Sequence, residues 1–242
     1  MDLGLIAELN NNMLHFPRDP NSLGCLVNCF KSRALGLEYE FVKGKIEDWE
    51  FNYYDNATNK RHITWIKIQA LYDQMMDEAN REIDMFCFLD TDAWIRDEDG
   101  FQKFLEDFEK SSASLAIARD LDEKDATYLN SGFLAFKNNE RGRAMIEKFW
   151  TNPDYRGYWK HYRVEQRLLS DYYYDHKEDY MVLPLEDFNT PCGRVVRHCW
   201  IKHMQETSVL EEVIACFTKI AIGGIDSGKV KLGKDVVVFQ DN

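Results

Sequence analysis

Short apolar segments recur along this chain, and one of them runs directly into two carboxylates. Residues 85–89 (Met-Phe-Cys-Phe-Leu) are all apolar, and Asp90 and Asp92 follow them. An unbroken apolar run of this length predicts a strand buried on both faces, which is typical of parallel strands in α/β proteins. Ligands of such sheets bind outside the carboxyl ends of the strands, where both carboxylates fall.

Other apolar segments predict six further strands, and helical patterns separate most of them. The strands are expected over residues 3–7, 39–42, 115–118, 132–136, 180–184 and 236–239. A helix is expected from the N-cap Thr64 through residue 80, because apolar residues there follow the three- and four-residue spacing of a packed face. Further helices are predicted over residues 22–36, 101–108, 145–150, 166–174 and 209–222.

The alternation of strands and helices predicts the fold class. Two or more βαβ units imply an α/β fold, with a mixed, mainly parallel sheet and helices on both of its faces. The length of 242 residues suits one domain, and no repeat, linker or low-complexity segment divides the chain. We therefore expect a single domain over residues 1–242, with its core in residues 1–205 and a C-terminal extension in residues 206–242.

Composition and charge exclude some classes of partner. Hydrophobic residues make up 45% of the chain and charged residues 30%, which describes a globular protein rather than a disordered one. The formal net charge of −12 argues against nucleic acid, because proteins that bind the phosphate backbone need a basic surface. Clusters of Lys and Arg are small, so an anionic membrane surface is not expected either.

Cysteine use and apolar stretch lengths predict a cytoplasmic protein. The six cysteines form no CxxC pair and are too sparse for a small disulfide scaffold, so we interpret them as reduced thiols. The N-terminus has no basic region followed by a long apolar run, and no apolar stretch reaches 18 residues. We expect neither secretion nor a membrane anchor, unless the chain is a trimmed catalytic domain.

The pair Asp90 and Asp92 is the first candidate site. Two carboxylates at the mouth of a buried strand repel each other and lose hydration, so they need a cation beside them. Carboxylate oxygens suit Mg²⁺ or Mn²⁺, and these ions in turn bind diphosphates. The pair therefore predicts a divalent-metal site for a nucleotide diphosphate. The alternative is structural, because aspartates commonly cap the helix that follows a strand.

Several segments follow one another in an order that resembles a known family. They are Trp65-Ile66-Lys67, Asp90-Thr91-Asp92, Asn130-Ser131-Gly132-Phe133, Glu165-Gln166, Pro184 through Asn189, and His198. This order resembles the metal-dependent GT-A glycosyltransferases, most closely the retaining α-galactosyl/xylosyltransferase group of fungi and plants and more distantly the glycogenin and galactosyltransferase group. The resemblance covers residues 60–205 and implies the GT-A fold, which is Rossmann-like.

The resemblance implies how a metal and a diphosphate are held. Asp92 would coordinate Mn²⁺ or Mg²⁺ directly, and Asp90 would reach the metal or the ribose and sugar of the donor. Lys67 would neutralise phosphate charge, and the alternative for it is a solvated helix residue. His198 would be the third protein ligand, but the glycine that usually follows it in the family is missing here. The ligand is therefore His198, His203 or neither, and the predicted strand at residues 195–196 favours His198.

The resemblance also implies donor-binding and catalytic residues. The donor would contact Asn130, Ser131, Gly132 and Asn189. Glycine lets the backbone approach a ligand closely, and an asparagine amide offers donors and acceptors to sugar hydroxyls. Glu165 and Gln166 would be the catalytic pair near the reacting sugar carbon, where they would stabilise an oxocarbenium-like transition state. The alternatives are an ordinary turn at residues 130–132, a solvated helical pair at 165–166 and a core histidine at 198.

These expectations define one enzyme and its rivals. We expect a glycosyltransferase that moves a hexose or pentose from a nucleotide diphosphate sugar, a UDP-sugar in the first instance, to a hydroxyl of a glycan or glycoprotein. Retention of configuration follows from the resemblance alone. The rivals are a metal-dependent nucleotidyltransferase or phosphohydrolase that uses the same aspartates, and a non-catalytic nucleotide-sugar or glycan-binding module.

Overall fold

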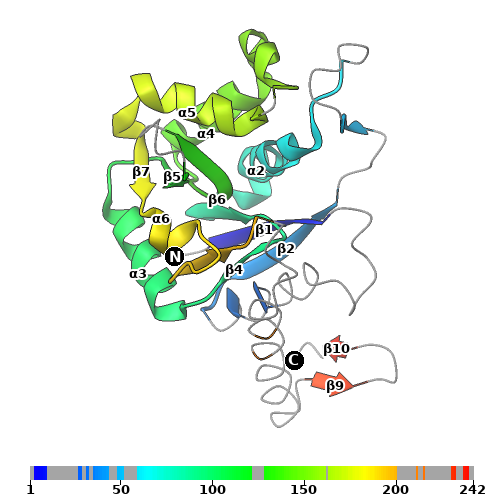
Figure 1. Ribbon diagram of the computed structural model, residues 1–242, viewed down its shortest axis with the longest axis vertical. Helices are drawn as coiled ribbons and strands as arrows, with labels where there is room; N and C mark the ends of the chain where they lie inside the picture. Colours follow the sequence, from blue (N-terminus) through cyan, green and yellow to red (C-terminus); the bar gives the residue numbers. More distant parts are fainter. Residues whose placement is uncertain are drawn as a thin grey trace.

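A six-stranded sheet forms the centre of the molecule (Figure 1). We describe it from a computed structural model, which covers residues 3–9, 27–28, 31–32, 35–43, 48–51, 59–121, 128–161, 163–200, 211, 215, 230–232 and 237–239. The order of the strands across the sheet is β2-β1-β3-β6-β5-β7. Their bounds are β1 Leu3–Leu9, β2 Glu38–Lys43, β3 Met85–Leu89, β5 Leu115–Arg119, β6 Leu129–Lys137 and β7 Tyr180–Leu183.

The sheet is mixed and mainly parallel, as predicted. Strand β1 runs parallel to β2 and β3, and β5 runs parallel to β7. Only β6 is reversed among these strands, because it pairs antiparallel with β3 on one side and with β5 on the other. Strands β3 and β5 therefore point the same way and end at the same edge of the sheet.

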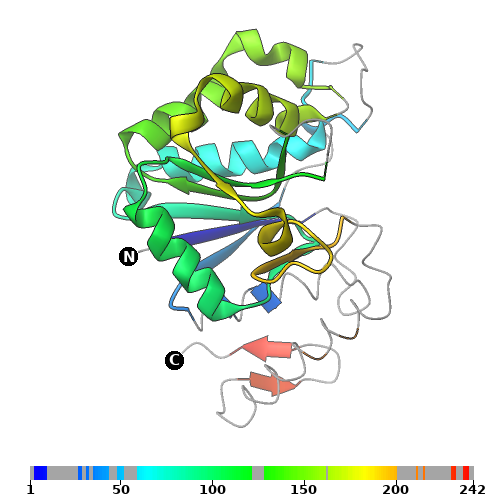
Figure 2. The ribbon, with the colours of Figure 1, turned by 60° about the vertical axis from the view of Figure 1, so that its left-hand side comes forward.

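Helices cover both faces of the sheet, which confirms the predicted layers (Figure 2). Helices α2 (Ile66–Met76), α4 (Glu140–Thr151) and α5 (Val164–Asp175) pack on one face, and α3 (Glu98–Lys110) and α6 (Leu185–Phe188) on the other. Short 3₁₀ helices lie between these elements: η3 Ile63–Trp65, η4 Glu78–Asn80, η5 Pro153–Tyr158 and η6 Lys177–Asp179.

Strand β3 is buried on both faces, as its unbroken apolar run predicts. Phe86 and Phe88 point into the cluster that contains α2, α4 and α5, whereas Met85, Cys87 and Leu89 point into the cluster that contains α3 and α6. Each of the five side chains is at most 1% exposed. Successive side chains of a strand point to opposite faces, so a strand between two helical layers needs apolar residues at every position.

Two local expectations were wrong. The helix expected from Thr64 to residue 80 begins as η3 with His62 as its N-cap, and α2 ends at Met76 because Asp77 is extended. The strand expected over residues 132–136 begins earlier, at Leu129, so the alternative of an ordinary turn at residues 130–132 is wrong because these residues lie inside β6. They coincide with an irregularity, because Leu134 pairs with Ile117 whereas Asn130 pairs with the next residue of β5.

Two small antiparallel sheets complete the described structure. Strand β4 (Ala93–Ile95) pairs with β8 (Val196–His198), and β9 (Val230–Leu232) pairs with β10 (Val237–Phe239). Residues 27–28, 31–32, 211 and 215 are helical, and the rest of the helices expected over 22–36 and 209–222 lies largely outside the described residues. No helix in the described ranges is long and apolar enough to cross a membrane.

Candidate active site

The carboxyl end of β3 carries Asp90, and a buried lysine from α2 lies against it. The Lys67 ammonium is 2.7 Å from Asp90 Oδ1 and donates a hydrogen bond of 3.0 Å to Oδ2. The Lys67 side chain is 4% exposed, whereas that of Asp90 is 21% exposed. Lysine is almost never fully buried without a partner, so the structure excludes the solvated alternative for Lys67.

A second carboxylate, Glu165 in the first turn of α5, meets the same ammonium. Glu165 Oε1 lies 3.4 Å from Lys67 Nζ and accepts a hydrogen bond of 2.7 Å from Ser131 Oγ. Lys67 also donates to the Ser131 carbonyl at 3.2 Å. The Glu165 side chain is 2% exposed, and its Oε2 atom has no hydrogen-bond donor among the described residues. One network therefore joins α2, β6 and α5, and Glu165 is not a solvated residue.

A short antiparallel ladder brings His198 to the aspartates. Strand β4 begins directly after Asp92, and its Ala93 pairs with His198 of β8. His198 Nε2 consequently lies 3.3 Å from Asp92 Oδ1 and 4.0 Å from Asp90 Oδ2. Candidate ligand atoms of Asp90, Asp92 and His198 all lie within 4.8 Å of one another. Two carboxylates and one imidazole at this spacing form a set that can share a divalent cation.

The amide of Asn189 sets the tautomer of His198. Asn189 Nδ2 donates to the Arg119 carbonyl at 2.8 Å, and the indole N–H of Trp200 donates to Asn189 Oδ1 at 3.1 Å. Because a carbonyl only accepts and an indole N–H only donates, these contacts identify the amide oxygen. That oxygen lies 2.7 Å from His198 Nδ1, so Nδ1 carries a proton. When the ring is neutral, Nε2 therefore presents its lone pair to the aspartates, and when the ring is charged, Nε2 donates a hydrogen bond to Asp92.

The site is negatively charged. Among the residues that the structure describes, the carboxylates of Asp90, Asp92 and Glu165 face the ammonium of Lys67, and these four groups together carry a formal charge of −2. Burial lowers the pKa of His198, but the charge of Asp92, its hydrogen bond and the charge of Asp90 together raise that pKa above its usual value. The negative formal charge and the raised pKa of His198 both show that the space between the aspartates and His198 stabilises positive charge, as a cation site requires.

Gly132 leaves the space that the His198 ring occupies. A Cβ atom at residue 132 would lie 2.1 Å from Cε1 of His198 and 2.7 Å from Nε2. The Gly132 N–H donates to Asn130 Oδ1 at 2.8 Å, and its carbonyl accepts from the N–H of Asp90 at 2.9 Å. We expected this glycine to let the backbone approach a ligand, and in the structure its close neighbour is the imidazole ring.

Gln166 connects the site to an aspartate that the sequence pattern did not single out. Its Nε2 donates to Asp120 Oδ2 at 2.8 Å, and its Oε1 accepts from the Ser131 N–H at 3.4 Å. Asp120 directly follows β5, just as Asp90 follows β3, and both strands end at the same edge. The apolar run over residues 115–118 reaches Asp120 after one intervening residue, Arg119, so a weaker form of the signal that identified Asp90 was present at Asp120.

Two residues beside the site have a left-handed backbone although neither is glycine. The φ angle is 38° at Val164, immediately before Glu165, and 50° at Trp200, two residues after His198. Such conformations cost about 1–3 kcal/mol each and persist where the surrounding structure imposes them, often at functional sites. Each strained residue thus lies next to, or belongs to, the network of hydrogen bonds at the site.

The structure brings every described residue that we expected at the site into one connected group. Contacts already given link Lys67, Asp90, Asp92, Asn130, Ser131, Gly132, Glu165, Gln166, Asn189 and His198. His203, the alternative metal ligand, lies outside the described residues. Asp120 and Trp200 belong to the group and were not expected there.

The mixed sheet and its helical layers define the fold as that of the GT-A glycosyltransferases. A glycosyltransferase involved in the glycosylation of the major capsid of PBCV-1 matches with a TM-score of 0.57 at 11% identity, over 90% of this chain and 100% of that one. The glycosyltransferase GlyE of Streptococcus pneumoniae TIGR4 matches with a TM-score of 0.57 at 12% identity, over 94% of this chain and 64% of that one.

The galactosyltransferase LgtC, solved in complex with donor and acceptor sugar analogs, has the same fold. It matches with a TM-score of 0.54 at 13% identity, over 90% of this chain and 96% of that one. No protein-family profile matches the chain, and no curated protein is significantly similar to it in sequence. The structural matches establish the fold and confirm the fold prediction. Because the sequence identities are this low, the reaction has to be argued from the site.

Proposed function

We propose that this chain is a metal-dependent glycosyltransferase. It moves a sugar from a nucleotide diphosphate sugar, with UDP as the expected nucleotide, to a hydroxyl of a glycan or glycoprotein. The observation that carries the proposal is the cluster of Asp90, Asp92 and His198 beside the buried Lys67. The cluster lies at the carboxyl end of β3, where sheets of this kind bind ligands. Retention of configuration is part of the proposal through the family resemblance.

The candidate ligands fit Mn²⁺ or Mg²⁺. Carboxylate oxygens suit both ions, and a neutral imidazole with a free Nε2 lone pair is a ligand that Mn²⁺ accepts. Asp90, Asp92 and His198 would hold the ion, and Asn189 keeps His198 in the tautomer that ligation needs. When bound, the ion supplies positive charge that stabilises the departing diphosphate.

Lys67 provides the fixed positive charge of the site. Its ammonium is held between Asp90 and Glu165 before any donor arrives, so it needs no reorganisation when phosphates bind. Because the Lys67 side chain is 4% exposed and bonded to protein groups, we assign it to balancing the phosphate charge of the donor through space rather than by direct contact. Glu165 is 2% exposed and bonded to Lys67 and Ser131, so we assign it to positioning these groups rather than to direct contact with the sugar.

Gln166 is the member of the catalytic pair that we assign to the reacting sugar. It is less buried than Glu165, and its amide lies between Asp120 and the backbone of Ser131. Asn189 is 1% exposed and its amide is bonded to protein groups at both ends. We therefore assign Asn189 to orienting the imidazole, in place of the donor-binding role that the resemblance implies.

Three further points belong to the proposal and rest on the sequence. The cytoplasmic location follows from cysteine use, and the single domain over residues 1–242 follows from the lack of a linker. Membership of the retaining α-galactosyl/xylosyltransferase group is proposed from the order of the matching segments.

A thermal-shift panel of nucleotide diphosphate sugars, each measured with Mn²⁺ and with chelator, tests the proposal. A ligand that binds only the folded protein stabilises it by RT ln(1 + [L]/Kd), which is about 2.7 kcal/mol at a hundredfold excess over Kd. We expect one donor to raise the Tm in Mn²⁺ and to lose most of that shift in chelator. Asp92→Ala should abolish the metal-dependent part, and Asp99→Ala, an exposed aspartate of α3, is the matched control.

Turnover of the selected donor separates glycosyl transfer from its rivals. Sugar transfer to one member of an acceptor panel is the expected result. Donor hydrolysis at the same rate with and without acceptors would indicate a phosphohydrolase. Transfer of the nucleoside monophosphate to an acceptor, with release of sugar 1-phosphate, would indicate a nucleotidyltransferase. Donor binding without turnover would indicate a binding module. An equal thermal shift with and without Mn²⁺ would contradict the metal site.

A further inference from the structure

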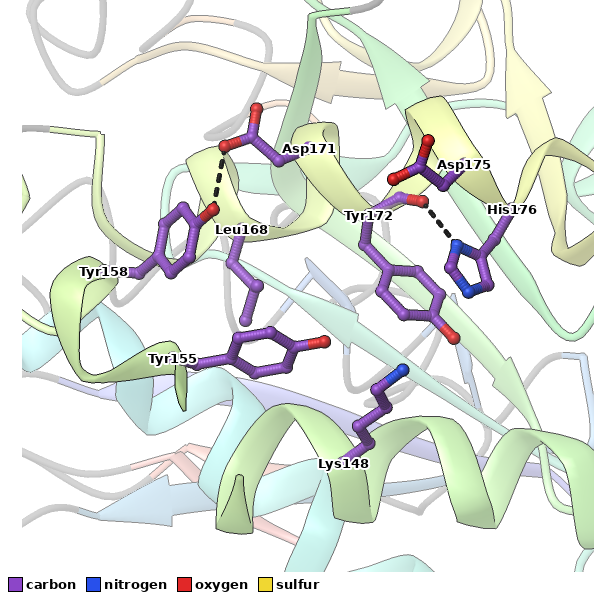
Figure 3. Close-up of a pocket in the computed structure, with 8 residues that line it drawn as sticks. All are labelled: Lys148, Tyr155, Tyr158, Leu168, Asp171, Tyr172, Asp175 and His176. Carbon is purple, nitrogen blue, oxygen red and sulfur yellow. Dashed lines mark hydrogen bonds between the residues drawn. The ribbon is translucent and has the colours of Figure 1, made fainter. Parts of the chain in front are cut away.

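A pocket of about 210 Å³ lies away from the aspartates, between α4, η5 and the later turns of α5 (Figure 3). Tyr155 and Tyr158 come from η5, Tyr172 and Asp175 from α5, and Lys148 from α4. Nothing in the proposed sugar transfer uses these residues. The wall is therefore built mainly from tyrosines and charged groups on three separate elements.

The tyrosine rings are held in place by their neighbours. The Tyr158 hydroxyl donates to Asp171 Oδ2 at 3.0 Å, and the Tyr155 and Tyr158 rings meet edge to face with centroids 6.1 Å apart. The Tyr172 ring stacks on His176 at 3.8 Å and meets Phe149 edge to face at 5.0 Å. The Lys148 ammonium also lies over the Tyr172 ring, 4.8 Å from its centroid. Rings fixed in this way lose little conformational entropy when a ligand binds, and the Tyr155 and Tyr158 rings supply the apolar surface.

Polar groups at the pocket have capacity for further hydrogen bonds. Figure 3 shows the Tyr155 hydroxyl and the Lys148 ammonium directed toward the middle of the group. The hydroxyls of Tyr155 and Tyr172 have no hydrogen-bond partner among the residues that the structure describes. A hydroxyl both donates and accepts, an ammonium donates, and the exposed Asp175 carboxylate accepts, so all the roles needed to bind hydroxyl groups are present.

The charges of the pocket favour a neutral ligand. Asp171 is held by Arg167 through contacts of 2.9 Å to each of its oxygens, so this carboxylate is already neutralised. Lys148 and Asp175 then carry one positive and one negative charge. A phosphate would meet one ammonium opposed by a carboxylate, and a cation would meet the reverse, so neither ion finds an excess of opposite charge.

We propose that this pocket is a saccharide-binding subsite, separate from the donor site, that holds one sugar ring of the acceptor glycan. A sugar ring combines apolar C–H faces, which pack on tyrosine rings, with hydroxyls that match the surrounding donors and acceptors. The volume of about 210 Å³ is below the range of 300–1,000 Å³ that is typical for drug-sized ligands, which suits a single ring.

Helix α5 connects this pocket to the active site. Gln166 lies in its first turn, and Tyr172 and Asp175 lie six and nine residues further along. At 1.5 Å per residue, these positions are roughly 9–14 Å from Gln166 along the helix axis. Because the helix turns by about 100° per residue, Tyr172 and Asp175 lie on the side of α5 roughly opposite Gln166, so an oligosaccharide with one ring in the pocket has to pass around the helix to bring another ring to the site. The acceptor role rests on the proposed function, whereas saccharide binding itself does not.

Saturation-transfer NMR with methyl glycosides of galactose, glucose, mannose and xylose, in chelator, tests the subsite. We expect at least one glycoside to bind the wild-type protein, and both Tyr155→Ala and Asp175→Ala to weaken it about fivefold or more. Tyr174 is 66% exposed on the same helix but lies outside the pocket, so the Tyr174→Ala variant should bind the glycoside as the wild-type protein does. Asp92→Ala should also bind normally, because the subsite does not use the metal ligands.

Two further measurements make the result decisive. Tyr155→Phe keeps the ring and should bind more strongly than Tyr155→Ala, provided that both variants unfold at the wild-type temperature. With an active acceptor, Asp175→Ala should raise the acceptor KM and leave the rate of donor hydrolysis unchanged. The exposed Asp175 gives a variant that is expected to fold in any case.

The outcomes distinguish this proposal from the proposed function. Absence of glycoside binding, binding that ignores Tyr155→Ala and Asp175→Ala, or binding that is lost in Asp92→Ala would overturn the subsite. Glycoside binding without any metal-dependent donor shift would support the subsite and refute the glycosyltransferase. The reverse pattern would refute the subsite alone.

Discussion

Replacing Lys67 with methionine tests whether a buried ammonium holds the site together. Methionine keeps an apolar stem and removes the charge, so Asp90 and Glu165 lose contacts of 2.7 and 3.4 Å. The side chains of Lys67 and Glu165 are 4% and 2% exposed, and removing one partner of a buried ion pair typically costs about 3–5 kcal/mol. We expect about 3 kcal/mol, because Asp90 is 21% exposed and regains part of its hydration.

Urea unfolding followed by circular dichroism, in chelator, measures this loss. Lys103→Met is the matched control, because Lys103 pairs with Asp107 at 2.6 Å but the two side chains are 73% and 47% exposed. Exposed ion pairs contribute little to stability because water screens both charges, so the control should lose little. Adding Glu165→Gln to Lys67→Met neutralises a buried carboxylate that has lost its partner. The double variant should therefore lose less unfolding free energy than the sum of the losses in the two single variants.

Two results would refute this reasoning. A loss of stability in Lys67→Met no larger than that in Lys103→Met would show that the buried ammonium has no structural role. A double variant as unstable as the sum of the two single variants would show that Lys67 and Glu165 are not energetically coupled. Either result would also remove the basis for assigning Glu165 to the positioning of Lys67.

Three further predictions concern the metal and the chemistry. Gly132→Ala places a Cβ atom against the His198 ring and should weaken Mn²⁺ binding in calorimetry about 10- to 100-fold, whereas Gly157→Ala, with no atom within 4 Å, should not. The pKa of His198 is raised above its usual value of 6.5, so protons compete with Mn²⁺ for the imidazole and the Mn²⁺ affinity should begin to fall above pH 6.5 as the pH is lowered. An affinity that does not change between pH 5.5 and 8.5 would exclude imidazole ligation. Gln166→Ala should lower kcat with little change in donor KM, and wild-type rates would remove Gln166 from the mechanism.

Local pattern determined much of this protein. Residues 85–89 are apolar at every position because both faces of β3 are covered, so the strand, its burial and the exposed end at Asp90 follow from the sequence alone. The apolar residues 115–118 similarly indicate that Asp120 follows a buried strand, although Arg119 separates it from the apolar run. The helix boundaries near Thr64 were wrong because the cap there is a histidine in a 3₁₀ turn, which weak local preferences do not reveal.

Tertiary structure decided how the site is assembled. The reversed direction of β6 and its irregularity at residues 130–132 depend on pairing with two strands from distant parts of the sequence. His198 reaches Asp92 only because β8 pairs with β4, and Lys67 meets Glu165 only because α2 and α5 cover the same face of the sheet. The period of the hydrophobic pattern specifies which face of a strand or helix is buried. Strand register and the choice of neighbouring elements are set by long-range packing. The sequence therefore predicted these residues as candidates, and only the folded chain brings them together.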